Sequence, residues 1–93
     1  MAETKEEVPK NEKKIGKVAH YYTKLSVAAI DLTGELEVGD EIHILGHTSD
    51  FKQKVDSMQI QHESIKKAKK GDSVGMKVKE HVRENDVVYR VGK

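Results

Sequence analysis

Two segments of the chain place a Gly-Asp pair directly before a run in which apolar and polar residues alternate. The first occupies residues 36–44 (LEVGDEIHI) and the second residues 68–78 (AKKGDSVGMKV). A glycine at such a turn lets the backbone take a positive φ without a clash at Cβ. Strict alternation places every second side chain on one face of a strand, as expected when only that face meets a core. Two such units in one short chain predict an all-β fold built from a closed or nearly closed sheet.

The chain has 93 residues, which suffice for one domain with a small core. Hydrophobic residues make up 35% of it and charged residues another 35%, with one Phe, three Tyr and no Trp, so the core must be mostly aliphatic. Such a core leaves little room for a buried active-site cleft. Cysteine is absent, which excludes disulfides and thiolate chemistry.

The chain carries no signal for membranes or export. No apolar run approaches the roughly 20 residues that span a bilayer. Residues 1–7 (MAETKEE) contain no apolar signal-peptide core. We therefore expect a cytoplasmic protein without a membrane partner.

The net charge of +1 conceals an uneven distribution along the chain. Residues 15–50 contain two basic and six acidic side chains, a balance of −4, whereas residues 51–93 contain eleven basic and six acidic ones, a balance of +5. The folded molecule could therefore present a basic face to an anionic partner, unless the order of the strands mixes the two segments.

Residues 1–14 differ in composition from the remainder and are predicted to form a disordered, charged tail. They contain four Glu, four Lys and the only proline, with Val8 as the single branched aliphatic residue. Such a segment buries too little surface to offset its ordering entropy. We expect the folded domain to span residues 15–93, and its stability to be nearly unchanged when the tail is removed.

Alternation and turn residues divide the domain into six expected strands. They lie at residues 15–22, 25–32, 41–45, 51–62, 73–79 and 87–91. The inward side chains expected in three of them are Ile42 and Ile44, then Val74, Met76 and Val78, and finally Val87, Tyr89 and Val91. Apolar residues change parity within residues 25–32 and near Asp56-Ser57, which predicts a β-bulge in each of those strands. Residues 63–70 are expected to form an irregular connection.

Three motifs, in this order, resemble the second domain of the translational GTPases, the family of elongation factor Tu and elongation factor 1-alpha. Residues 32–42 (LTGELEVGDEI) resemble the family's G-x-[IL]-K-V-G-D-x-[IV] turn, and residues 68–75 (AKKGDSVG) resemble its A-x-P-G-D-N-V-G turn. Residues 55–62 (VDSMQIQH) resemble its long strand. The resemblance covers residues 15–91 and implies a six-stranded translation-factor-like β-barrel without enzymatic activity of its own.

The same resemblance implies candidate binding residues. In elongation factors this barrel holds the aminoacylated end of tRNA with a Glu on the long strand, and that position falls on Gln59. A basic or imidazole residue used nearby falls around Gln61 and His62. No stretch reads G-x-x-x-x-G-K-[ST], so the phosphate loop of a GTPase is missing and no nucleotide ligand is expected. A similar barrel also resembles the C-terminal part of some U32-family peptidases, and fold similarity alone does not transfer function.

Two features are candidates for nucleic-acid binding on their own chemistry. The densest positive cluster consists of Lys66, Lys67, Lys69 and Lys70. These lysines could contact phosphates, and the alternative is a solubilising rim of the barrel. Tyr21 and Tyr22 are adjacent and must point to opposite faces of a strand, so one of them, which we take to be Tyr22, could stack on a nucleobase. The alternative is cross-strand packing.

The five histidines, at positions 20, 43, 47, 62 and 81, raise the question of a metal site. Zinc requires three or four ligands that converge at about 2.0–2.3 Å. The spacing of these histidines brings no such set together, so we expect exposed histidines, no metal and no cofactor. No Ser-His-Asp set or pair of carboxylates can be recognised either, and we expect no catalytic residue.

The sequence therefore predicts a non-catalytic binding module, not an enzyme, whose partner is RNA or a component of the ribosome and translation machinery. The alternative is a protein-interaction or accessory module unrelated to translation. Affinity that persists at high salt would favour the alternative, because phosphate contacts weaken steeply with salt.

Overall fold

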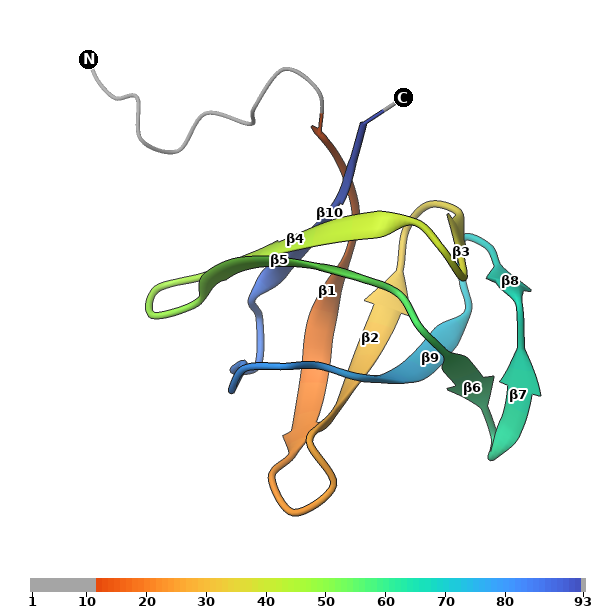
Figure 1. Ribbon diagram of the computed structural model, residues 1–93, viewed down its shortest axis with the longest axis horizontal. Helices are drawn as coiled ribbons and strands as arrows, with labels where there is room; N and C mark the ends of the chain where they lie inside the picture. The colour runs from red at the N-terminus through yellow and green to blue at the C-terminus, as the bar shows by residue number, and fades with distance from the viewer. Residues whose placement is uncertain (1–11, 93) are drawn as a thin grey trace.

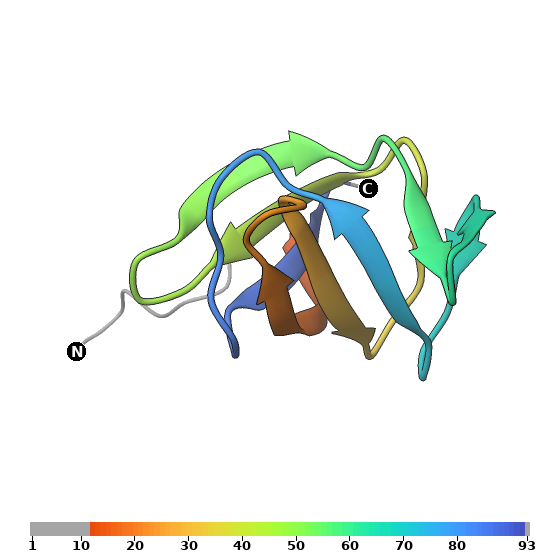
Figure 2. The same ribbon diagram turned by 90° about the horizontal axis from the view of Figure 1, so that it is seen from below.

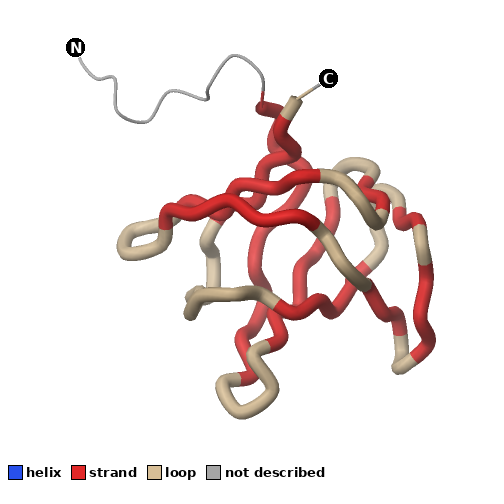
Figure 3. Tube along the Cα trace, viewed as in Figure 1, coloured by secondary structure: helices blue, strands red, loops and turns tan. Residues whose placement is uncertain are grey.

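The computed structural model describes residues 12–92, which form ten β-strands and no helix (Figures 1 and 3). The strands are β1 (Glu12–Tyr22), β2 (Val27–Leu32), β3 (Leu36–Glu37), β4 (Glu41–Leu45), β5 (Asp50–Lys54), β6 (Met58–Ile60), β7 (Glu63–Ile65), β8 (Lys67–Ala68), β9 (Ser73–Lys77) and β10 (Val87–Val91). The predicted all-β class is confirmed. Among the described residues, no helix is long and apolar enough to cross a membrane.

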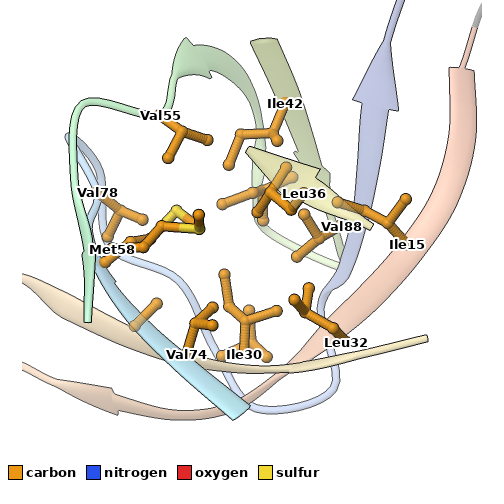
Figure 4. Packing of buried hydrophobic residues seen from close by; sticks show 14 of the residues in the cluster. Ile15, Ile30, Leu32, Leu36, Ile42, Val55, Met58, Val74, Val78 and Val88 are labelled. Carbon is orange, nitrogen blue, oxygen red and sulfur yellow. The ribbon is translucent and has the colours of Figure 1, made fainter. Parts of the chain in front are cut away.

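Eight strands form one antiparallel sheet in the order β5-β4-β10-β1-β2-β9-β6-β7, and β3 pairs separately with β8. The sheet is strongly curled (Figure 2), and the buried side chains of the core lie inside the curl (Figure 4). Strands from the basic second half of the chain (β5, β10, β9) are interleaved with strands from the acidic first half (β4, β1, β2). The order of the strands therefore mixes the acidic and the basic segment of the chain. The sequence had left this open as the alternative to a separate basic face.

The closed six-stranded barrel predicted from the sequence is wrong, because the sheet is open and has β5 and β7 as its edges. The expected strand 51–62 is interrupted at residues 55–57, which separate β5 from β6. Val55 turns into the core there, and its backbone bonds to the β3–β4 turn. Its N–H donates to the carbonyl of Asp40 (2.8 Å), and its carbonyl accepts from the N–H of Gly39 (2.9 Å). The chain thus crosses between the two ends of the sheet without a ladder joining them.

One side chain bridges part of the gap between β5 and β9. The Gln53 amide donates through Nε2 to the carbonyl of Lys77 (3.0 Å), and its Oε1 accepts from the N–H of Lys79 (2.8 Å). An amide side chain therefore takes the place of the backbone pairing that a closed barrel would have at this position.

The Gly-Asp turns have the predicted geometry. Gly39 and Gly71 have φ values of 101° and 95°. In each turn the aspartate side chain accepts a hydrogen bond from the N–H three residues earlier, from Glu37 to Asp40 (2.9 Å) and from Lys69 to Asp72 (3.0 Å). A third turn, residues 83–86, repeats the arrangement with Asn85 at φ 77° and a 3.0 Å bond from the Arg83 N–H to Asp86. Asparagine tolerates the left-handed region well enough to replace glycine there.

The core consists mostly of aliphatic side chains that the curled sheet directs inward (Figure 4). The buried set is Ile15, Val18, Ala28, Ile30, Leu32, Leu36, Ile42, Ile44, Phe51, Val55, Met58, Ala68, Val74, Met76, Val78, Val82 and Val88. The predicted inward residues of β4 and β9 are confirmed by this set. Burial of such side chains stabilises the fold by about 1.5–3 kcal/mol each relative to exposure.

The predicted face of the last strand is wrong. Val88 lies in the core, whereas Val87 and Val91 are only partly buried. Register explains this: Val88 pairs with Ile44 and Arg90 with Ile42, and directly opposed residues share a face of the sheet. Tyr89 is buried as well, but on the outer face, where it pairs with His43.

The bulge predicted within residues 25–32 lies instead in the neighbouring strand. The pairing of β2 with β9 is continuous, and the register of β1 shifts between Val18 and His20 and again between Lys14 and Gly16. Leu25, which suggested a strand, lies in the β1–β2 turn and is exposed.

The first strand begins earlier than expected. Residues 12–14 were assigned to the tail, but they belong to β1 and pair with β10, with Glu12 opposite Val91 and Lys14 opposite Tyr89. The remainder of the predicted tail, residues 1–11, lies outside the described part of the chain, as does Lys93.

Candidate functional site

A groove of about 400 Å³ opens on the outer face of the sheet beside the β1–β2 turn and the β6–β7 turn. Its lining residues come from four strands and two turns that the sheet order brings together: Tyr22, Leu25, Val27, Ala29, Gln59, Gln61, His62, Ser73, Val74 and Gly75. Tyr22, singled out as an exposed aromatic residue, thus lies around one depression with Gln59, Gln61 and His62, which the family resemblance had singled out.

The floor of the groove is hollow because small residues meet there. Ala28 and Ile30 of β2 point into the core, so Val27 and Ala29 must point outward. Ala29 pairs with Gly75 on β9, which has no side chain, and Gly75 pairs in turn with Gln59 on β6. A larger side chain at either of the paired small positions would fill the depression.

Tyr22 and Leu25 form an exposed apolar wall of the groove. Their exposed fractions are 48% and 61%, and they are the large hydrophobic side chains most exposed among residues 12–92. The predicted division of the two tyrosines is confirmed, because Tyr21 packs against the core while Tyr22 faces solvent. The Tyr22 ring meets the His20 ring edge-on, with centroids 4.5 Å apart and planes at 66°.

The opposite rim is a two-residue hairpin turn in a strained conformation. Gln61 and His62 connect paired residues Ile60 and Glu63, and both have positive φ, 52° and 69°. Two-residue turns of this kind favour Asn-Gly, because left-handed conformations cost other residues about 1–2 kcal/mol each. Such strain is characteristic of positions held for function rather than for stability.

The four lysines lie apart from this groove. All are exposed: Lys66 lies between β7 and β8, Lys67 lies in β8, and Lys69 and Lys70 lie in the turn before β9. Lys67 and Lys69 line a second depression of about 360 Å³ together with Glu35 and Asp72. The structure therefore does not bring the lysine cluster together with Tyr22.

A second cluster of polar groups surrounds His43 and was not predicted from the sequence. The His43 side chain is 10% exposed, and its Nδ1 lies 2.7 Å from Glu12 Oε1, whose side chain is 3% exposed. Its Nε2 lies 2.7 Å from Asp50 Oδ1. Lys52 adds an ion pair to Glu12 at 3.7 Å. An ionised carboxylate can accept a hydrogen bond but cannot donate one. Both ring nitrogens of His43 must therefore carry a proton to bond to Glu12 and Asp50.

The proton on His43 is favoured by its neighbours. Burial lowers the pKa of the ring, but the hydrogen bonds to Asp50 and Glu12 and the charges of both carboxylates outweigh it, so the pKa lies above its ordinary value of 6.5. The prediction that the histidines are exposed is wrong at this position. Within residues 12–92, no group of three or more His, Cys, Asp or Glu side chains is arranged to hold a metal ion.

No family model matches the chain, but curated proteins are similar to it. An uncharacterized protease of Methanocaldococcus jannaschii is 47% identical over 76 residues, which cover 81% of this chain and 19% of that protein. A collagenase of Porphyromonas gingivalis is 40% identical over 81 residues, which cover 85% of this chain and 22% of that protein. The chain therefore spans about a fifth of the length of these relatives.

The fold also matches solved structures. The C-terminal domain of a protein assigned as a U32 peptidase in Geobacillus thermoleovorans superposes with a TM-score of 0.78 at 19% identity, covering 82% of this chain and 96% of that one. A second crystal structure of that domain gives the same TM-score and is covered to 89%. At this level of identity the match establishes the fold alone.

These comparisons correct three predictions from the sequence. The predicted relationship to the second domain of translational GTPases is wrong. The similar proteins are a U32 peptidase domain and proteins named protease and collagenase. The prediction of an RNA-binding module of the translation machinery is contradicted by the same names. The prediction that the chain is not an enzyme is contradicted as well, because the similar proteins are named protease and collagenase, although the chain spans only about a fifth of their length.

Proposed function

We propose that this chain is a protease-associated domain, of the kind that forms the C-terminal part of U32 peptidases, and that it binds polypeptide in the groove beside Tyr22. The observation that carries the proposal is the 47% identity, across 81% of the chain, to a protein named as a protease. A domain that makes up about a fifth of such a protein would position the polypeptide for the remainder of the enzyme.

The groove has the properties that binding an unfolded segment requires. It is concave and largely apolar, with polar groups at one rim that can bond to a peptide backbone. Tyr22 and Leu25 supply exposed apolar surface, which is the usual mark of an interaction site on a small soluble domain. Gln59, Gln61 and His62 supply amide and imidazole groups for hydrogen bonds to peptide groups.

The test is direct binding of unfolded polypeptides. Fluorescently labelled gelatin and casein are titrated with the protein, and saturable anisotropy changes are expected. A variant with Tyr22→Ala and Leu25→Ser should bind about tenfold more weakly, since it removes the apolar wall. Its matched control is Lys67→Ala with Lys69→Ala, which alters the second depression instead.

Circular dichroism and thermal unfolding should show both variants folded, because all four side chains are exposed. The proposal would be overturned if neither polypeptide bound, or if the control pair weakened binding as much as the groove pair.

A further inference from the structure

We infer that the groove beside Tyr22 selects an uncharged, proline-rich segment in the polyproline II conformation. This inference rests on the proposed function, that the groove binds polypeptide, and it names the class of segment bound. Three properties of the groove support it: an uncharged lining, an exposed aromatic ring held by its neighbours, and a floor whose backbone is already paired.

The lining carries no Asp, Glu, Lys or Arg side chain, although such residues make up 35% of the chain. The adjacent carboxylate of Asp31 accepts a hydrogen bond from Ser73 (Oγ to Oδ1, 3.1 Å). A charged segment would lose hydration in this groove without finding an opposite charge in the lining. The charge pattern therefore favours an uncharged ligand.

The exposed ring of Tyr22 is a pre-ordered surface. His20 packs edge-on against it with a centroid separation of 4.5 Å, and Glu84 lies 3.2 Å from His20 Nδ1. A side chain that is already held loses less conformational freedom when a ligand binds. Polyproline II segments dock in aromatic-lined grooves for a similar reason, since their own conformation is fixed before binding.

The floor of the groove is already paired on both sides along β2 and at Gly75 of β9. Along residues 27–31, β2 pairs with β1 on one side and with β9 on the other. β9 pairs on its far side with β6, through Gly75 and Gln59. A ligand over β2 and Gly75 is therefore recognised through side chains rather than by extending the sheet.

The polar rim matches the hydrogen-bonding groups of a proline-rich segment. Polyproline II has no internal hydrogen bonds, and proline has no N–H, so the segment presents carbonyl acceptors in excess of donors. Gln59, Gln61 and His62 bring amide and imidazole N–H groups to the groove. Donors from the protein and acceptors from the ligand are thus paired.

The experiment compares labelled peptides of about ten residues, roughly 31 Å long as polyproline II. One alternates Pro with Ala, the second Ser with Ala, and the third Pro with Glu or Lys. The Pro-Ala peptide should bind at least about fivefold more tightly than either of the others. Tyr22→Phe should retain this affinity and Tyr22→Ala should lose about tenfold, while the control Lys69→Ala should change nothing.

The outcomes separate the two proposals. Equal affinity for the three peptides, with gelatin still bound, would overturn the selection of proline-rich segments and leave the proposed function standing. No binding of gelatin, casein or any peptide would overturn both. Binding of a single-stranded RNA oligonucleotide that Tyr22→Ala abolishes, in the absence of peptide binding, would also overturn both and assign the groove to nucleic acid.

Discussion

Replacing His43 by Gln tests the buried cluster at the start of β1. The substitution removes the positive charge that lies between Glu12 and Asp50, each 2.7 Å from a ring nitrogen. The two contacts contribute unequally to the stability of the folded state. Asp50 has a 73% exposed side chain, so its contact contributes about 0–1 kcal/mol. The Glu12 side chain is only 3% exposed, so losing its partner leaves a buried carboxylate with Lys52 alone, at 3.7 Å.

The expected cost follows from the buried half of the cluster. A hydrogen bond to a charged group contributes about 1.5–3 kcal/mol, and isolating a buried charge adds to the loss. We therefore expect His43→Gln to lower the free energy of unfolding by about 2–4 kcal/mol at pH 6. In a domain of this size each kcal/mol corresponds to about 4–8 °C in Tm. The control is His47→Gln, an exposed histidine in the loop after β4, which should change Tm little.

The loss of stability caused by His43→Gln should decrease as the pH rises. Because the pKa of His43 is raised above 6.5 in the folded state, the native protein binds the proton more tightly than the unfolded chain. The stabilisation is complete below about pH 6.5 and is lost as the pH rises through the folded pKa. The difference in Tm between wild type and His43→Gln should therefore shrink between pH 6 and pH 9.

Other charged groups face the same cluster and must be held constant. Besides its own members Glu12, Asp50 and Lys52, these neighbours are Lys14 on β1, Glu41 on β4, Lys54 on β5 and the titratable Tyr89 hydroxyl on β10. When wild type and both histidine variants are unfolded thermally in the same buffer series, these neighbouring groups are the same in all three proteins at each pH. A difference that stays flat from pH 6 to pH 9, or an equal loss in His47→Gln, would refute the reasoning.

Four further perturbations test other parts of the structure. Truncating buried Met76 to Ala should cost about 2–4 kcal/mol in urea unfolding, and a negligible loss would contradict its place in the core. Changing Gln61 to Asn with His62 to Gly should raise Tm by relieving the strained turn while weakening peptide binding; unchanged binding would exclude the turn from the site. Asp86→Ala, which removes the acceptor for the Arg83 N–H, should cost about 1–3 kcal/mol, measured in the same way. Deleting residues 1–14 should lower Tm, because Glu12 and three strand pairs are lost, and an unchanged Tm would restore the boundary expected from the sequence.

Local chemistry explains which strands could be predicted. The bounds of β4, residues 41–45, follow from the Gly-Asp turn before it and Gly46 after it, and strict alternation identifies Ile42 and Ile44 as inward. In β10 the apolar residues Val87, Val88 and Tyr89 are contiguous, so alternation gives no direction. Only the pairing with β4, a contact far along the sequence, selects Val88 for the core.

The groove beside Tyr22 and the His43 cluster likewise depend on contacts between residues far apart in the sequence. Tyr22 could be selected from the sequence by its aromatic chemistry, whereas Gln59, Gln61 and His62 were selected through a resemblance that the comparisons contradict. Their grouping depends on the order β1-β2-β9-β6, which no local pattern encodes. The burial of His43 depends on a carboxylate from a segment whose composition suggested a disordered tail.

The placement of both sites on the outer face follows from the size of the domain. The concave side of the sheet is filled by aliphatic side chains from nearly every strand, which leaves no room for a ligand inside. A site on this fold must therefore be built from the outward residues of the strands and from the turns between them. The groove uses the outward positions of β2 and β9, where Ala29 and Gly75 leave space, and the strained β6–β7 turn as its rim. Because these outward positions lie outside the core, they can change while the aliphatic core and the fold are kept.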